Sequence, residues 1–79
     1  MGYHLEKIEK GVLGEPSKIA EEVAELADAM KQGNRILAMV ELSDVYGALE
    51  LVAERLGTNM AEVAMMAAAT RRAFEDGDR

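Results

Sequence analysis

Two pairs of acidic residues have a spacing that suits chemistry on a helix. Glu22 and Glu25 form one pair, and Glu41 and Asp44 form the other. Side chains at positions i and i+3 project from the same side of a helix, so each pair could hold one hard cation, or the two pairs could share two. Because the chain has no cysteine, four carboxylates favour Mg²⁺ or Mn²⁺ over Zn²⁺.

Ordinary surface charge is the alternative explanation for these pairs. Random placement of the 15 acidic residues in 79 positions gives about three pairs at this helix-neighbour spacing, and the chain has five, so their number decides nothing. Their placement favours a metal cluster. Glu41 and Asp44 lie in the most apolar segment, with no basic residue within one helical turn. A buried carboxylate must become protonated, pair with a cation or bind a metal.

Three predicted helices would position these residues. They run from Ser17 to Gln32, from about Arg35 to Leu56 and from about Met60 to Glu75. Either Ser17 caps the first helix or Pro16 is its first residue. Gly33 and Asn34 end the first helix and start the second, and such a short link makes an antiparallel hairpin. Gly57 closes the second helix, and Asn59 with Glu62 has capping-box spacing.

Apolar periodicity predicts which helix faces are buried. In the first helix the apolar face comprises Ile19, Ala20, Val23, Leu26, Ala27 and Met30. Glu22 lies at its edge, Glu25 one step further out, and Glu21 and Asp28 further still. In the second helix the main core stripe comprises Leu42, Val45, Leu49, Val52, Ala53 and Leu56, with Leu37, Val40 and Leu51 on another side. A helix that is apolar on two sides is sandwiched, so one side is expected to meet another subunit.

The predicted fold class is all-α: a helical hairpin plus a third helix, assembling into a four-helix bundle. Residues 1–16 are expected to form an N-terminal arm, either a short helix or an ordered segment, and residues 17–79 the domain. At 79 residues, a core alone stabilises a domain by only a few kcal/mol. We therefore expect a homo-oligomer, either a dimer or a tetramer.

Charge and hydropathy exclude several classes of protein. The net charge of −6 argues against a nucleic-acid duplex as partner, because binding to its backbone needs a cationic face. There is neither an apolar run of ~18 residues nor a basic-then-apolar leader, which predicts a cytoplasmic protein with no membrane span.

A di-iron site would need Glu-x-x-His on two helices. The single histidine, His4, lies outside the helices that carry the acidic pairs, so this site is not expected.

The acidic residues belong to a longer pattern. It reads Glu21-Glu22-x-x-Glu25, then 15 residues, then Glu41-x-x-Asp44. This pattern resembles the metal signature of the MazG-like nucleotide pyrophosphohydrolases, which share the all-α NTP pyrophosphatase superfamily with phosphoribosyl-ATP pyrophosphatase and the dimeric dUTPases. Segments 17–22, 28–29, 41–48 and 70–77 are similar to those of short, phage-type members. The resemblance covers about Gly11 to the end of the chain.

The resemblance implies hydrolysis of a nucleoside triphosphate, with a dNTP expected, to the monophosphate and pyrophosphate. It implies Mg²⁺ as cofactor, with Mn²⁺ as an alternative. Position by position, the metal ligands would be Glu22, Glu25, Glu41 and Asp44, and Glu22 would also count as catalytic. Glu21 would orient or deprotonate the attacking water, or is simply an exposed glutamate.

Four further residues are candidates for substrate binding. Lys18 would contact phosphate, or pairs with Glu22 at i, i+4. Arg71 and Arg72 would bind phosphates, or balance charge at a helix end; many relatives carry a lysine and an Asn or Asp in this later helix. Tyr46 is either a neighbour of the base or a core tyrosine.

The sequence is also compatible with two alternative functions. One is a non-catalytic helical module that uses the sandwiched second helix purely for assembly or interaction. The other is a pyrophosphohydrolase of the phosphoribosyl-ATP type.

Overall fold

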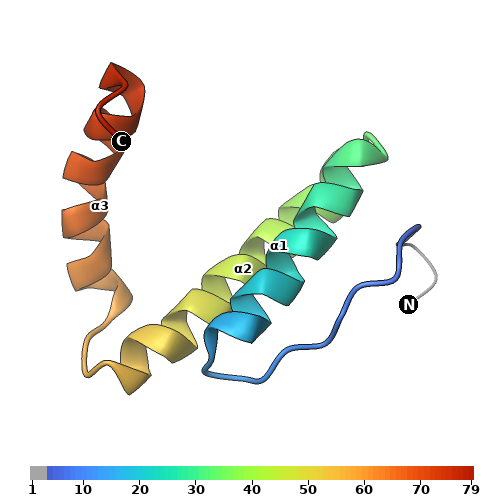
Figure 1. The fold of residues 1–79 in the computed structure, drawn as a ribbon, viewed down its shortest axis with the longest axis horizontal. Coiled ribbons are helices and arrows are strands. Elements are labelled where there is room, and N and C mark those ends of the chain that lie inside the picture. Colours follow the sequence, from blue (N-terminus) through green and yellow to red (C-terminus); the bar gives the residue numbers. More distant parts are fainter. Residues whose placement is uncertain (1–3) are drawn as a thin grey trace.

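The structure, a computed structural model, describes residues 4–79 as three α-helices joined by short turns (Figure 1). The helices are α1 (Pro16–Lys31), α2 (Arg35–Arg55) and α3 (Met60–Asp76). No strand occurs in these residues, so the all-α prediction is confirmed. None of the helices in this described part combines the length and the apolar character needed to cross a membrane.

The link between α1 and α2 is formed by the two residues that the sequence indicated. Gly33 has a φ of 70°, a left-handed conformation that glycine adopts without a steric penalty. Asn34 is the N-cap of α2, and its Oδ1 accepts a hydrogen bond from the Leu37 N–H at 3.0 Å. The same capping holds at the start of α3, where Asn59 Oδ1 accepts from the Glu62 N–H at 3.0 Å.

The start of α1 decides between the two expectations for Pro16 and Ser17. Pro16 is the first helical residue, where its missing N–H costs nothing. Ser17 does not cap the helix; its Oγ accepts a hydrogen bond from the Val12 N–H at 3.0 Å. The hydroxyl therefore holds the segment that precedes the helix.

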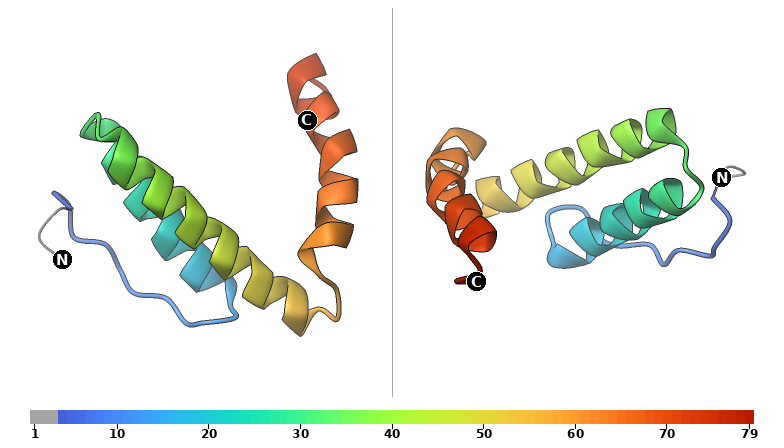
Figure 2. Two further views of the ribbon diagram at one scale, coloured as in Figure 1. Left: turned by 180° about the vertical axis from the view of Figure 1, so that it is seen from behind. Right: turned by 90° about the horizontal axis from the view of Figure 1, so that it is seen from above.

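Residues 4–15 form an extended arm that runs antiparallel to α1 (Figures 1 and 2). Near the end of α1, Lys31 Nζ donates to Glu6 Oε2 at 3.0 Å. Nearer its start, the Gly11 N–H donates to Glu21 Oε1 at 2.8 Å. Of the two forms expected for this segment, its described residues adopt the ordered, non-helical one.

The hairpin packs α1 against α2 through small and acidic residues. Among the described residues, the buried ones are Ala29, Ala48, Ala53, Glu21, Glu22, Asp28 and Glu41. The predicted core stripe of α2 is only partly covered in the single chain: Ala53 is buried and Val45 and Val52 are half-buried, whereas Leu42 is 56% exposed and Leu56 is 76% exposed. The hairpin contact therefore covers short and acidic side chains and leaves the leucines of this stripe at the surface.

The third helix adds nothing to this core. Within the described residues α3 contacts α2 and not α1, and Figure 2 shows it standing apart from the hairpin. No residue of α3 is buried. Met65, Met66 and Phe74 are all exposed, so this helix too presents apolar surface that the single chain leaves uncovered.

Candidate metal centre

Four carboxylates from the two helices of the hairpin meet in one group. Glu22 and Glu25 come from α1, and Glu41 and Asp44 come from α2. One oxygen of each lies within 4.8 Å of the others. In octahedral Mg²⁺ coordination, neighbouring ligands are about 3.0 Å apart and opposite ligands about 4.2 Å apart, so the four oxygens would draw together to bind one ion or could share two. The structure thus brings together the four residues that the sequence singled out.

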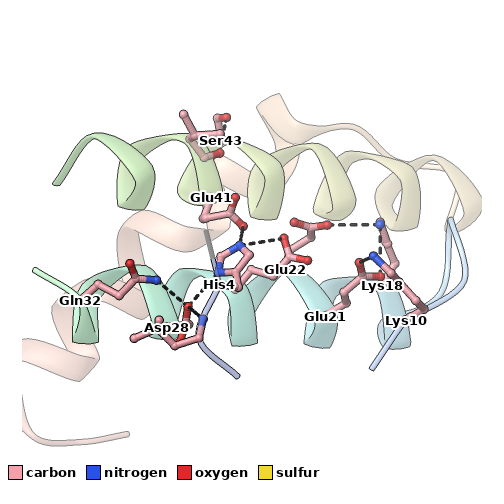
Figure 3. A network of polar contacts seen from close by, with 12 residues as sticks. His4, Lys10, Lys18, Glu21, Glu22, Asp28, Gln32, Glu41 and Ser43 are labelled. Carbon is pink, nitrogen blue, oxygen red and sulfur yellow. Dashed lines mark hydrogen bonds and ion pairs between the residues drawn. The ribbon is translucent and has the colours of Figure 1, made fainter. Parts of the chain in front are cut away.

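Burial shows that this group is not a solvated face. The exposed fraction of Glu22 is 6% and that of Glu41 is 4%, and Figure 3 shows both side chains between the helices. Oε2 of Glu22 and Oε2 of Glu41 are buried and accept no hydrogen bond within the described part of the chain. Such oxygens are costly unless a cation compensates them. The residues present therefore fit a hard divalent cation.

The pKa values of two carboxylates in this group also favour a bound cation. Burial raises the pKa of Glu22 above its ordinary value, with the nearby Glu25 adding to the rise. Burial also raises the pKa of Glu25, and the hydrogen bond and charge of Glu41 raise it further. The cluster by itself thus resists full ionisation, whereas a bound divalent cation favours the ionised form.

Lys18 pairs with two glutamates beside the group. Its Nζ lies 3.2 Å from Glu22 Oε1 and 3.2 Å from Glu21 Oε1. These hydrogen bonds, that of Glu22 first, raise the pKa of Lys18. The expected i, i+4 pair with Glu22 is present, and a contact with phosphate stays a prediction. Lys18 also borders an open pocket of about 540 Å³ whose lining includes Glu22, Ser43 and Asp44.

Glu21 lies outside the four-carboxylate group and faces the arm. Its Oε1 accepts from the Gly11 N–H at 2.8 Å, and its Oε2 lies 3.5 Å from Lys10 Nζ. The Gly11 hydrogen bond is the main reason that its pKa is lowered. The expectation of an exposed glutamate is wrong, since Glu21 is only 4% exposed. Its contacts anchor the arm, and a role in orienting water stays a prediction.

Asp28 is buried for the same reason. Its Oδ2 lies 2.9 Å from His4 Nδ1 and accepts hydrogen bonds from the Leu5 N–H at 3.1 Å and from Gln32 Nε2 at 2.8 Å. Asp28 is thus buried although it lies outside the predicted apolar face of α1, because the arm covers this side of the helix.

The remaining candidate residues lie away from the carboxylates. Arg71 is exposed on α3, with its Nε 3.3 Å from Glu75 Oε2, and Arg72 is exposed beside it. In the described part of the chain α3 contacts only α2 and stands apart from the hairpin (Figure 2), so neither arginine lies against α1, which carries Glu22 and Glu25. Tyr46 is 51% exposed and lines an apolar groove on α2, so it is not a core tyrosine of the single chain.

His4 is the residue near the group that the sequence analysis set aside. Its Nε2 lies 3.6 Å from Glu41 Oε2 and 3.9 Å from Glu25 Oε2. The length of the arm could have revealed this. About a dozen extended residues span up to ~40 Å, which exceeds the ~24 Å of a 16-residue helix, so an arm folded back along α1 can reach its far end.

Comparison of the chain with protein-family models, with curated proteins and with solved structures finds no match. What the chain does is therefore inferred from its own residues and their geometry.

Proposed function

We propose that this protein is a Mg²⁺-dependent hydrolase that converts a nucleoside triphosphate, with a dNTP as the expected substrate, to the monophosphate and pyrophosphate. One observation carries the proposal: the carboxylate group of Glu22, Glu25, Glu41 and Asp44, whose ligand oxygens lie within 4.8 Å of one another. The similarity of the acidic pattern to that of MazG-like enzymes supports the choice of reaction.

The four carboxylates would hold the metal, with Mn²⁺ as an alternative to Mg²⁺. When bound, the ion supplies charge neutralisation at phosphate oxygens and lowers the pKa of a bound water. Asp44 is the exposed member of the group, so it marks the side from which a phosphate can approach. Lys18 lies at that opening. Its cationic Nζ would leave one of its glutamate partners and bind a phosphate oxygen instead.

The proposal includes assembly into a homo-oligomer, a dimer or a tetramer, through four-helix bundles. The apolar side of α2 supports this: Leu42, Tyr46 and Leu49 are exposed along one groove. On α1, Val23 is 47% exposed and Met30 is 66% exposed. The only buried apolar residues in the described part of the chain are three alanines. Packing these exposed faces against a second copy would give the domain the core that it lacks.

Pyrophosphate release tests the reaction. We would incubate the protein with a panel of dNTPs and NTPs, with phosphoribosyl-ATP included, with and without Mg²⁺. Release that depends on Mg²⁺ supports the proposal. In Glu41→Gln, the loss of a buried metal ligand is expected to reduce turnover by at least about a hundredfold, with unchanged helical content by circular dichroism. Glu50→Gln is the matched control, an exposed carboxylate on the same helix.

A non-catalytic assembly module is the second candidate. The exposed apolar surface on all three helices favours it, because assembly alone would explain that surface. No pyrophosphate release from any nucleotide, together with unchanged oligomerisation of Glu41→Gln, would support this candidate and sink the enzyme. If phosphoribosyl-ATP is cleaved and the dNTPs are not, the reaction class stands and the substrate changes.

A further inference from the structure

We propose that His4 forms a second metal site with Glu25 and Glu41, and that this site selects a later first-row transition metal ion such as Zn²⁺ or Co²⁺ over Mg²⁺. Ligand atoms of these three side chains lie within 4.8 Å of one another. The site shares Glu25 and Glu41 with the metal centre of the proposed function. These two shared ligands are its only dependence on that function. The arm would then be part of the metal centre and not a mere covering of α1.

The distances around the imidazole suit coordination better than direct pairing. His4 Nε2 lies 3.6 Å from Glu41 Oε2 and 3.9 Å from Glu25 Oε2, which exceeds the usual length of a hydrogen bond. Metal–nitrogen and metal–oxygen bonds of about 2.1 Å place two ligands of a tetrahedral ion about 3.4 Å apart. A shift of a few tenths of an ångström would bring His4 Nε2 to this spacing from each of the two glutamate oxygens, and all three ligand atoms lie within 4.8 Å of one another.

Asp28 fixes the orientation of the ring. Its Oδ2 lies 2.9 Å from His4 Nδ1 and also accepts hydrogen bonds from the Leu5 N–H and from Gln32 Nε2. Since this carboxylate oxygen acts as an acceptor, Nδ1 is the donor. In the neutral imidazole this leaves the lone pair on Nε2, the nitrogen that faces Glu41 (Figure 3). A carboxylate behind a histidine that is turned toward a metal is a common arrangement in metal sites.

An independent observation at Glu41 points to a ligand. The side chain of Glu41 is 5% exposed, and its Oε2 accepts no hydrogen bond within the described residues. This is the oxygen that lies nearest to His4 Nε2. An ionised oxygen buried in this way is costly unless a cation is bound to it.

The ligand types select the class of metal. Mg²⁺ prefers oxygen ligands and octahedral geometry, whereas an imidazole nitrogen favours later transition metals. Three protein ligands also leave a coordination position for water or a phosphate oxygen, as in catalytic zinc sites. The chain has no cysteine and a single histidine, so no other imidazole or thiolate competes for the ion.

The single histidine makes a direct test possible. We would titrate Zn²⁺ into the metal-free protein and follow the ring nitrogens of His4 by ¹⁵N NMR. A saturable change at Nε2 near one equivalent of Zn²⁺, not produced by Mg²⁺, is the expected result. Ring signals that stay unchanged at excess Zn²⁺, or that change equally with Mg²⁺, would overturn the proposal and leave His4 as a structural contact of the acids.

Calorimetry with variants gives the second readout. Zn²⁺ affinity is expected to fall at least about tenfold in His4→Ala and by a similar factor in the positioning variant Asp28→Asn. Mg²⁺ affinity should stay within about twofold, since the four carboxylates are intact. Lys7→Ala, an exposed change on the same arm, is the matched control. Equal Zn²⁺ affinity in His4→Ala and Lys7→Ala would contradict the site.

The two proposals fail separately. Absence of pyrophosphate release from every nucleotide removes the proposed function, while the Zn²⁺ response of His4 can persist. Mg²⁺-dependent release from a protein whose His4 does not respond to Zn²⁺ removes only the second site.

Discussion

The backbone N–H of Gly11 donates to Oε1 of Glu21 at 2.8 Å and ties the arm to the first half of α1. Close approach makes this bond possible. A Cβ on Gly11 would overlap the backbone of Ser17 and Lys18, so any side chain at this position would push the arm away from the helix.

We expect Gly11→Ala to detach the arm and lower the free energy of unfolding by about 1 kcal/mol or more, as a backbone clash commonly does. Hydrogen exchange should become faster at the amides of the arm, while the amides of α2 stay protected. Gly47→Ala is the control: a Cβ there meets nothing within 4 Å in the chain, and alanine suits a helix interior better by roughly 0.5–1 kcal/mol. Equal protection of the arm in both variants would contradict the clash.

The raised pKa values of Glu22 and Glu25 predict how stability changes with pH. Since the folded protein holds these protons more tightly than the unfolded chain, the stability of the metal-free protein falls as pH rises from the ordinary glutamate pKa through the raised values. A double variant, Glu22→Gln with Glu25→Gln, lacks this fall. The free energy of unfolding of the double variant, relative to that of the wild-type protein, should therefore increase with pH across that window.

Bound Mg²⁺ should offset this loss of stability at higher pH, because it binds the ionised carboxylates. At a hundred times its dissociation constant, a ligand of the folded state adds about 2.7 kcal/mol. Thermal unfolding in Mg²⁺ and in chelator, at a pH above the window, measures this gain. A melting temperature that does not respond to Mg²⁺ in the wild-type protein would argue against the four-carboxylate centre.

Substitution of Lys18 distinguishes a role in phosphate binding from a purely structural role. Removal of its charge in Lys18→Ala is expected to raise KM by about tenfold, the equivalent of one charge-assisted hydrogen bond, and Lys18→Arg should retain most of the affinity. Initial rates over a range of dNTP concentration measure this. If KM stays constant while the melting temperature drops, Lys18 is only a partner for Glu22 and Glu21.

The apolar groove of α2 predicts the assembly interface. Leu42→Glu places a charge among exposed apolar side chains and should weaken self-association by at least about tenfold, since burial of a leucine is worth more than about 1.4 kcal/mol. Light scattering across a concentration series measures the state of the protein. Arg35→Glu, at the exposed start of α2, serves as the control. An unchanged oligomer in Leu42→Glu would place the interface elsewhere.

Local signals were enough to predict the helices and the acidic group. Gly33 and Asn34 mark a turn because one adopts a positive φ and the other caps a helix through its side chain. That turn makes the hairpin, and the hairpin brings the pair at Glu22 against the pair at Glu41. Each step depends on residues close in sequence, which is where periodicity and capping rules are informative.

Long-range contacts explain what the sequence did not reveal. Burial of Glu21 and Asp28 depends on an arm with no helical periodicity, and His4 reaches Asp28 across 24 positions of the chain. The core stripe was predicted only in part, because periodicity identifies the most apolar face of a helix, not the face that its nearest neighbour covers. In α2, Ala48 and Glu41 are buried in the hairpin, whereas Leu42 is exposed.

The position of His4 has a practical consequence for protein production. A segment fused ahead of Met1 begins at most about 14 Å of extended chain from the imidazole. A polyhistidine purification handle at that end would offer competing nitrogen donors to any ion bound there and would obscure measured metal selectivity. The handle belongs after Arg79, beyond α3, or should be cleaved before titration.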